Sequence, residues 1–187
     1  MLAEQALDSL SKEFTDSSLA LISYNSSFSP STINTERRNF YTITSDPAVI
    51  FDGTDSIYPA GNYYATFKPF IEAAKTVTPF FNLVITAIAD SSFGSVALRF
   101  VTADTLPEDN IVACLAICQD SIHGIKDFNY VCYQFYSFPL VMIYPDTLDT
   151  TITFSHNLLA SKLRAVAFTQ DLDTKEIMQA ITTKFQY

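Results

Sequence analysis

Residues 45–55 read SDPAVIFDGTD, a stretch in which a proline stands directly before a short apolar run that ends in Asp-Gly. Proline lacks the N–H that a sheet ladder needs, so within sheets it is confined to strand starts, edges and bulges. Asp-Gly is a favoured pair for a tight hairpin turn. We therefore predict that Pro47 opens a strand over 48–51 and that Asp52 and Gly53 turn the chain toward a partner strand near 56–58.

The residues on either side of this stretch alternate between helix and strand patterns. Residues 2–14 place apolar side chains on one helical face, and residues 33–43 predict a second short helix. Residues 19–24 are apolar on both faces, which is typical of a strand that is covered from both sides. Residues 62–77, NYYATFKPFIEAAKTV, again carry apolar side chains at helical spacing. The first 77 residues therefore predict an α/β unit.

The pattern changes at Pro79, where short segments rich in Val, Ile, Phe, Tyr and Thr begin and turn or acidic clusters separate them. Regular short strands of this kind suggest an antiparallel sandwich. We predict strands near 80–89, 95–103, 110–121, 128–136, 139–144, 149–155, 162–170 and 176–183. The sequence thus predicts an α+β chain in two domains, with an α/β half over 1–78 and an antiparallel β-sandwich over 79–187.

Composition and charge exclude several classes of protein. Hydrophobic residues make up 48% of the 187 and aromatic residues 14%, so a sizeable core is available and disorder is not expected. The net charge of −9 argues against nucleic-acid binding, which needs Lys and Arg to displace counterions from phosphates. The apolar run at 111–118 is far shorter than the roughly 20 residues that span a bilayer. We therefore predict no transmembrane segment and no nucleic-acid partner.

The three cysteines, Cys114, Cys118 and Cys132, form no Cys-x-x-Cys pair. Reactive thiols need a stabilised thiolate, often at a helix N-terminus, whereas these three lie in apolar strand runs. We predict that all three are buried free thiols. The two histidines, His123 and His156, have no cysteine or serine partner at an interpretable spacing, so we interpret them as non-catalytic.

No other catalytic array is recognisable, so we predict no catalytic residue, no metal and no cofactor. The acidic loop residues Asp104, Glu108 and Asp109 are interpreted as turn-forming and solubilising rather than as calcium ligands. Residues 129–138, NYVCYQFYSF, are aromatic on both strand faces. One face fits a core, and the other is suited to another domain, a glycan or a peptide. A protein or peptide partner therefore stays open.

Four segments in order carry a resemblance to a known family: AEQALDSL at 3–10, LALISYN at 19–25, ERRNFYTITSDPAVIFDGT at 36–54 and LRAVAFTQDLDTKEIMQA at 163–180. On these segments the chain resembles the family related to the twenty-eight-kilodalton outer membrane protein of Bacteroidetes-like bacteria. The resemblance implies an exported or envelope protein with a thioredoxin-like half followed by a β-sandwich half. It also implies that Pro47 is the cis proline of the substrate-side loop.

The sequence departs from this family at its beginning. Members usually have a first strand and a cysteine pair directly before the helix that starts here at residue 3. In a thioredoxin-like sheet that strand is central, between the strand at 19–24 and the Pro47 strand. Without it, those two strands either pair directly or expose their edges. The departure favours a truncated gene model or a fragment.

Two functional hypotheses follow from the resemblance. The first is a non-catalytic binding or structural protein of the cell envelope with a degenerate thioredoxin-like half. The second is the C-terminal part of an exported thiol-disulfide oxidoreductase whose catalytic cysteines lie upstream of residue 1. The residues of this chain favour a non-enzyme.

Overall fold

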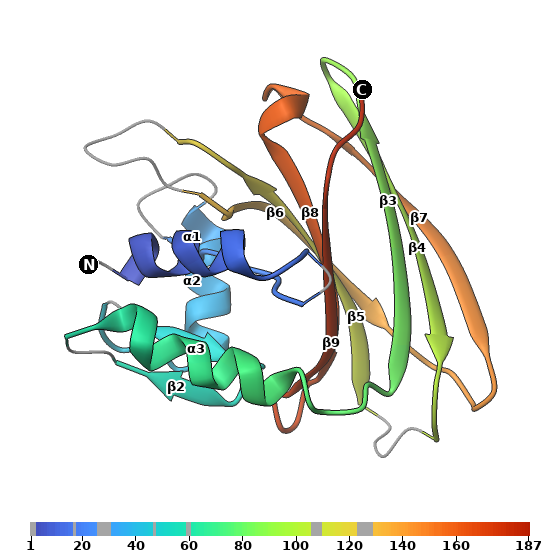
Figure 1. Ribbon diagram of the computed structural model, residues 1–187. Coiled ribbons are helices and arrows are strands. Elements are labelled where there is room, and N and C mark those ends of the chain that lie inside the picture. Colours follow the sequence, from blue (N-terminus) through green and yellow to red (C-terminus); the bar gives the residue numbers. More distant parts are fainter. Residues whose placement is uncertain are drawn as a thin grey trace.

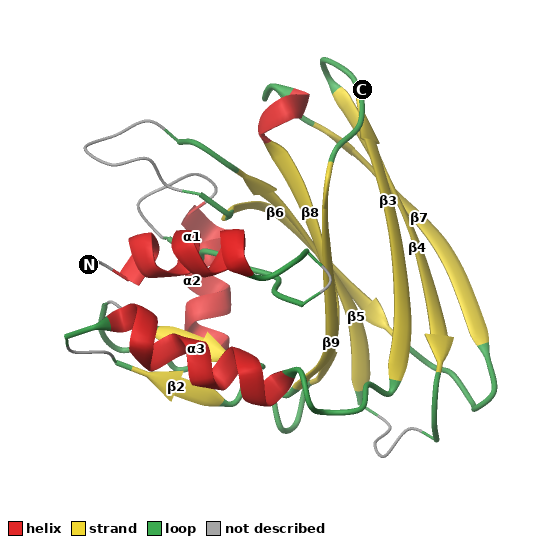
Figure 2. Ribbon diagram, viewed as in Figure 1, coloured by secondary structure: helices red, strands yellow, loops and turns green. Residues whose placement is uncertain are grey.

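The protein is described by a computed structural model that covers residues 3–16, 18–25, 31–46, 48–58, 61–105, 110–122 and 129–187. It is built in three layers (Figure 1). A three-stranded sheet packs on one face of a four-stranded sheet, and a layer of three helices and a β-hairpin covers the other face (Figure 2). The chain is therefore α+β and contains an antiparallel sandwich, as the sequence predicts.

The sandwich consists of two sheets whose named strands all pair antiparallel. The first sheet has the order β3-β4-β7, with β3 at Phe81–Ala89, β4 at Phe93–Thr102 and β7 at Thr147–Ser155. The second has the order β6-β5-β8-β9, with β5 at Ile111–Gln119, β6 at Val131–Pro139, β8 at Leu163–Asp171 and β9 at Ile177–Lys184. A short 3₁₀ helix, η1 at Ala160–Lys162, precedes β8.

The two central strands of the second sheet are buried on both faces. In β5, Leu115 and Ile117 point into the core between the sheets, while Cys114, Ala116 and Cys118 point into a second apolar cluster under the helical layer. A strand with both faces covered reads as a continuous apolar run rather than an alternating one. This explains why the sequence of β5 is IVACLAICQ.

The helical layer contains α1 at Ala3–Glu13, α2 at Ser31–Phe40 and α3 at Tyr63–Ala74, with the hairpin strands β1 at Val49–Phe51 and β2 at Asp55–Ile57. Helices α1 and α3 lie side by side (Figure 1) and share a small core of Ala6, Leu10, Phe67 and Ile71. The helix predicted at 33–43 is present but begins and ends earlier. The predicted hairpin at 48–58 is present as well.

Two predicted strands are wrong. Residues 19–24 form a single parallel bridge from Ser23 to Val131, not a strand, because an extended segment becomes a strand only where a ladder of partners exists. Residues 140–143 alternate between buried and exposed side chains, with Leu140 and Met142 inside. The Leu140 N–H donates to the carbonyl oxygen of Ile111 at 2.9 Å, but these residues form no strand ladder among the described residues. Alternation reports burial and does not by itself report pairing.

Candidate functional site

A cavity of about 1400 Å³ lies inside the helical layer, next to the face of the four-stranded sheet. Residues of α1, α3 and β9 line it, together with Phe168 of β8. Residues 19–25 form one side wall, and residues 48–53, which include β1, form another. We call this space the groove. It is bounded by two extended backbone segments that belong to no common sheet.

The first side wall, residues 19–25, is hydrogen-bonded to a neighbouring segment of the sheet through the backbone of Ser23. The N–H of Ser23 donates to the carbonyl oxygen of Tyr130 at 2.8 Å, and the Ser23 carbonyl accepts from the N–H of Cys132 at 3.0 Å. In an extended chain, successive residues point their backbone groups to opposite sides, so those of Ile22 and Tyr24 face away from β6. Within the described part of the chain, no backbone hydrogen bond engages the N–H or carbonyl of either residue.

The second side wall, unlike the first, contains a strand, β1. β1 pairs with β2 in a two-stranded sheet, and no other strand of the described residues joins it. Asp52, with φ 46°, and Gly53, with φ 82°, turn the hairpin. The carbonyl oxygen of Asp52 accepts from the N–H of Ile177 at 2.8 Å, which anchors the hairpin to the start of β9. A two-stranded hairpin is marginal alone, so this anchor helps to hold it.

The lining of the groove is mostly apolar and half-buried. The helices contribute Leu7, Tyr63 and Ala74, and the sheet contributes Ile177 and Ala180. Covering such side chains with further apolar surface lowers the free energy by about 25 cal/mol per Å² of apolar surface buried. The groove is therefore suited to an occupant that offers apolar side chains toward both the helices and the sheet.

The charge of the groove is negative. Five carboxylates line it, against the two basic side chains Arg38 and Lys75. Arg38 is paired with Asp46, whereas Glu4, Asp52 and Glu176 make no ion pair among the described residues. Loss of hydration raises the pKa of Asp52, and the nearby charges of Asp55 and Glu176 raise that pKa further. Negative charge is thus concentrated where β1 turns beside β9.

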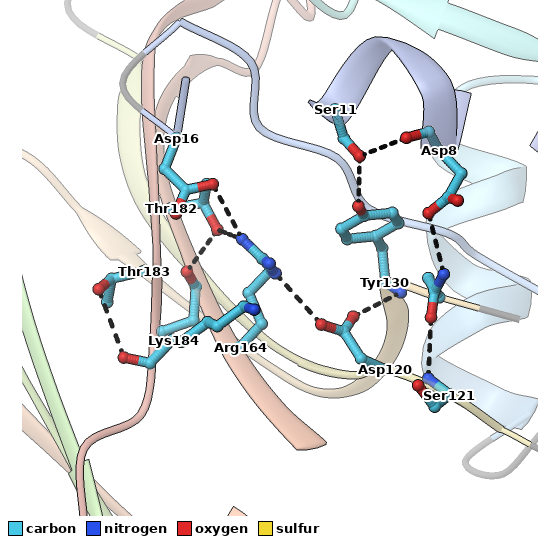
Figure 3. Close-up of polar contacts among 12 residues, drawn as sticks. Asp8, Ser11, Asp16, Asp120, Ser121, Tyr130, Arg164, Thr182, Thr183 and Lys184 are labelled. Carbon is cyan, nitrogen blue, oxygen red and sulfur yellow. Dashed lines mark hydrogen bonds and ion pairs between the residues drawn. The ribbon is translucent and has the colours of Figure 1, made fainter. Parts of the chain in front are cut away.

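A polar network holds α1 and the residues after it against the sheet (Figure 3). The buried guanidinium of Arg164, on β8, donates to Asp16 at 3.2 Å and to Asp120 at 3.4 Å. Asp120 accepts the N–H of Tyr130 at 3.0 Å, and the Tyr130 hydroxyl donates to Ser11 of α1 at 2.8 Å. Asp8 of α1 accepts from Asn129 at 3.1 Å. The network fixes the end of α1 from which the first side wall departs.

Arg37 fixes α2 to the same sheet without a carboxylate partner in the described residues. Its buried guanidinium donates to the Tyr41 hydroxyl at 2.8 Å and to the Gln170 side-chain oxygen at 2.9 Å. It also lies over the rings of Phe40, at 4.6 Å, and Phe135, at 4.7 Å. Cation–π contact partly offsets the cost of burying the charge. We interpret Arg37 as a structural residue.

The three cysteines are free and buried, as predicted. Burial raises the pKa of the Cys114 thiol to about 12, and does the same for Cys132. Burial also raises the pKa of Cys118 well above its ordinary value. None of the three lines the groove. Thiolate chemistry needs an accessible thiol with a lowered pKa, so these residues supply none.

Pro47 and His123 lie outside the described residues. The neighbours of Pro47, Asp46 and Ala48, line the groove. His156 is buried, with its Nδ1 at 3.1 Å from the Leu158 carbonyl oxygen, and no cysteine or serine side chain bonds to it in the part of the chain that is described. No group of three or more metal-ligating side chains gathers among the described residues. None of the described helices is both long and apolar enough to cross a membrane.

Sequence reasoning missed the polar residues that organise the site. Arg164 interrupts the apolar start of β8, LRAVAF, and a charge among apolar residues in a strand covered on both faces signals a buried pair. Its partners cannot be identified in the same way, because Asp16 lies 148 residues away in sequence. The groove itself depends on where residues 19–25 and β1 come to lie.

Comparison with known proteins identifies fold relatives only. No family model matches the sequence, and no curated protein matches it. Among solved structures, HBP35 of Porphyromonas gingivalis aligns with a TM-score of 0.69 at 7% identity, covering 83% of this chain and 57% of that chain. A domain of the outer membrane lipoprotein Omp28 from Porphyromonas gingivalis has a TM-score of 0.40 at 14% identity, covering 59% of this chain and 91% of that chain.

The chain therefore spans less than two thirds of the HBP35 chain that it matches. Beta-glucosidase 3B from Thermotoga neapolitana aligns with a TM-score of 0.35 at 12% identity, over 58% of this chain and 16% of that chain. At these identities, the alignment to HBP35 shows a shared fold over most of this chain and nothing about activity.

Proposed function

We propose that this chain is a non-catalytic binding or structural module of a protein exported to the bacterial cell envelope. The observation that carries the proposal is the groove, which has a mostly apolar lining and a volume of about 1400 Å³. It is bounded by the extended residues 19–25 and by β1, which pairs with β2 alone among the described strands. Such a space binds polypeptide more readily than it performs chemistry, because it brings together unused backbone hydrogen-bonding groups. The buried cysteines with raised pKa support the absence of redox catalysis by these residues.

Within this proposal, residues 1–78 form an incomplete thioredoxin-like domain and residues 79–187 form the β-sandwich domain. Two observations support it. The order of elements is α1, an extended segment, α2, β1, β2 and α3. The groove separates residues 19–25 from β1, where the resembled fold has its central first strand. Pro47 is then the cis proline of the substrate-side loop.

A second candidate function is the C-terminal part of an exported thiol-disulfide oxidoreductase whose catalytic cysteines lie upstream of residue 1. The observation in its favour is that this chain covers only 57% of the HBP35 chain. Reading the DNA before codon 1 separates the candidates. An apolar strand and a Cys-x-x-Cys in frame would favour the oxidoreductase, whereas a genuine start site would remove it.

Two measurements test the first candidate. We expect dithiothreitol to reduce a disulfide substrate such as insulin no faster in the presence of the purified chain than in its absence. Activity that disappears in the triple Cys→Ser variant would overturn it. We also expect fractionation of the producing bacterium to recover the protein with the envelope, and recovery in the cytoplasm alone would overturn the proposed localisation.

A further inference from the structure

Two of the three buried cysteines stand opposite each other on neighbouring strands. In the ladder between β5 and β6, Cys118 is the partner of Cys132. Both side chains point into the apolar cluster under the helical layer, and both thiols are free. Cys114 points to the same face, but it lies four residues before Cys118, about 13 Å along an extended strand, and its partner on β6 is Ser137. The ladder therefore brings Cys118 and Cys132 together and leaves Cys114 apart.

The backbone hydrogen bonds show which kind of cross-strand pair this is. The N–H of Cys132 donates to the Ser23 carbonyl oxygen at 3.0 Å, and the Cys132 carbonyl oxygen accepts from the Asn34 side chain at 3.4 Å. Neither partner belongs to β5. On β5, the N–H of Asp120 donates at 2.8 Å to a carbonyl oxygen just before β8, so the backbone groups of Cys118, two residues earlier, also face β8. Cys118 and Cys132 are therefore a pair that exchanges no backbone hydrogen bond.

A pair of this kind has the backbone geometry of a disulfide. In an antiparallel ladder, the Cα atoms of a pair without backbone hydrogen bonds lie about 4.5 Å apart, and its side chains are closer than those of a hydrogen-bonded pair. The Cα atoms of disulfide-bonded cysteines lie about 4.4–6.8 Å apart. The register shift between Ile117 and Cys118 leaves Tyr133 unpaired beside this pair, and such a bulge bends and twists the strand locally. The strands thus hold the two cysteines where rotation of the side chains joins their sulfur atoms.

We propose that Cys118 and Cys132 form a structural disulfide when the chain folds in the presence of a disulfide-bearing oxidant, and that Cys114 stays a thiol. The inference rests on the proposed export to the cell envelope, because disulfides persist in oxidising compartments outside the bacterial cytoplasm, whereas the cytoplasm keeps thiols reduced. The bond joins the edge strand β6 to β5 at the place where Ser23 attaches residues 19–25 to the sheet.

The bond forms by two successive thiol–disulfide exchanges. One cysteine, as its thiolate, attacks a sulfur of the oxidant's disulfide, which gives a mixed disulfide and releases the first oxidant thiol. The second cysteine attacks the chain's own sulfur in the mixed disulfide and releases the second oxidant thiol. The two cysteine protons end on these two thiols, and the oxidant takes up the two electrons. Both cysteines are buried in the folded chain, so the exchange takes place during folding, before the helical layer covers this face.

The test is oxidative refolding of the whole chain. The reduced chain is unfolded in guanidinium chloride and diluted into a mixture of oxidised and reduced glutathione, and its thiols are then counted with Ellman's reagent under denaturing conditions. We expect one thiol per chain, whereas a sample refolded with dithiothreitol should keep all three. Three thiols after refolding with oxidised glutathione would overturn the inference.

Mass spectrometry of the unreduced chain identifies the bonded pair. Trypsin cuts after Lys126 and so places Cys118 and Cys132 in separate peptides, 100–126 and 127–162. We expect these two peptides to stay joined until dithiothreitol is added, with fragmentation assigning the bond to Cys118. A bond to the other cysteine of the first peptide, or glutathione left on either member of the pair, would overturn the inference.

Matched serine variants separate the bond from the fold. Cys114→Ser should form the bond and keep no thiol, whereas Cys118→Ser should form no bond and keep two thiols, with circular dichroism checking that both variants fold. The bond closes a loop of 15 residues. Restricting the unfolded chain in this way should raise the melting temperature of the oxidised chain about 5–10 °C above that of the reduced chain. An unchanged melting temperature would overturn the structural role, and the peptide map decides the pairing if a variant fails to fold.

Failure of this inference and failure of the proposed function are distinguishable. Absence of the bond after refolding, together with recovery of the protein in the envelope, would overturn the inference and leave the proposed function standing. Recovery in the cytoplasm alone would overturn the proposed localisation, while the refolding experiment would still decide whether the cysteine pair joins.

Discussion

The backbone N–H of Ser23 donates to the carbonyl oxygen of Tyr130 at 2.8 Å, and this bond ties residues 19–25 to the outer edge of β6. Residues 19–25 therefore contact the edge of the four-stranded sheet and also line the groove. Because β1 is anchored separately, through Asp52 and Ile177, the two walls do not meet. The residues that make these two contacts also line the groove.

The first prediction concerns Arg164, which pairs with Asp16 and Asp120 in a buried position. Replacing it with methionine leaves carboxylates near the sheet without their partner. We expect Arg164→Met to lower the free energy of unfolding by about 2–3 kcal/mol. Urea unfolding followed by circular dichroism measures the loss.

The matched control for this variant is the exposed pair of Arg99 and Asp149. Exposed pairs contribute little to stability because solvent screens them, so Arg99→Met should change the free energy of unfolding far less than Arg164→Met. Equal effects at Arg99 and Arg164 would contradict the structural role of the buried network.

The second prediction concerns thiol reactivity. Burial raises the pKa of Cys114 and Cys132 to about 12, so almost no thiolate forms at pH 8. We expect Ellman's reagent to label none of the three cysteines in the folded chain within minutes at pH 8. All three should react in 6 M guanidinium chloride, which serves as the control. Fast labelling of one thiol in the folded chain would contradict its buried position.

The third prediction concerns Gly53 at the turn of the hairpin. A Cβ at this position would lie 1.9 Å from the Lys175 carbonyl oxygen, and the residue has φ +82°. We expect Gly53→Ala to destabilise the protein by about 2–4 kcal/mol, through backbone strain and the clash together. Thermal unfolding by calorimetry measures this loss.

Gly61 separates the two causes, because it has φ +97° but a Cβ added there would meet no atom of the described residues within 4 Å. Gly61→Ala should therefore show only the backbone cost, about 1 kcal/mol. An equal loss of stability in the two variants would contradict the close approach of Gly53 to Lys175, which lies between β8 and β9.

The fourth prediction is a pH dependence. The pKa of Asp52 is raised by lost hydration and by Asp55 and Glu176, so its charged form is disfavoured in the folded state. In the unfolded chain the carboxyl ionises at its ordinary pKa, near 3.8. The destabilisation by Asp52 is therefore absent below that pKa and develops as pH rises through the folded-state pKa.

We accordingly expect Asp52→Asn to stabilise the protein at pH 7 and to have little effect at pH 3. Asp149 is the opposite case, since its hydrogen bond from Arg99 lowers its pKa. Asp149→Asn should cost stability at pH 7. Urea unfolding at both pH values measures these signs, and a stabilised Asp149→Asn together with a destabilised Asp52→Asn would refute the electrostatics described here.

The sandwich is predictable from the sequence because its strands show their burial directly. β3 and β4 alternate, and β5 and β8 read as continuous apolar runs under two covered faces. The error at 140–143 arises because Leu140 and Met142 alternate with exposed neighbours without having a ladder partner among the described residues. Periodicity reports which side chains are buried, whereas pairing depends on which backbone lies alongside.

The groove can be anticipated from the sequence only as one of two alternatives. Residues 19–24 and β1 are expected either to pair or to expose their edges, and the structure shows that they do not pair. The choice depends on Ser23 reaching Tyr130 and on Asp52 reaching Ile177, which are contacts between residues far apart in the sequence. Local propensity carries no information about such distant contacts.

Backbone hydrogen exchange at residues 20–25 tests most directly whether the groove has an open edge. Ser23 donates its N–H to Tyr130, so we expect its amide to be protected, whereas the amides of Ile22 and Tyr24 should exchange at least 100-fold faster in the free chain. Protection of all three amides alike in a monomeric, peptide-free sample would contradict the open edge on which the proposed binding function depends.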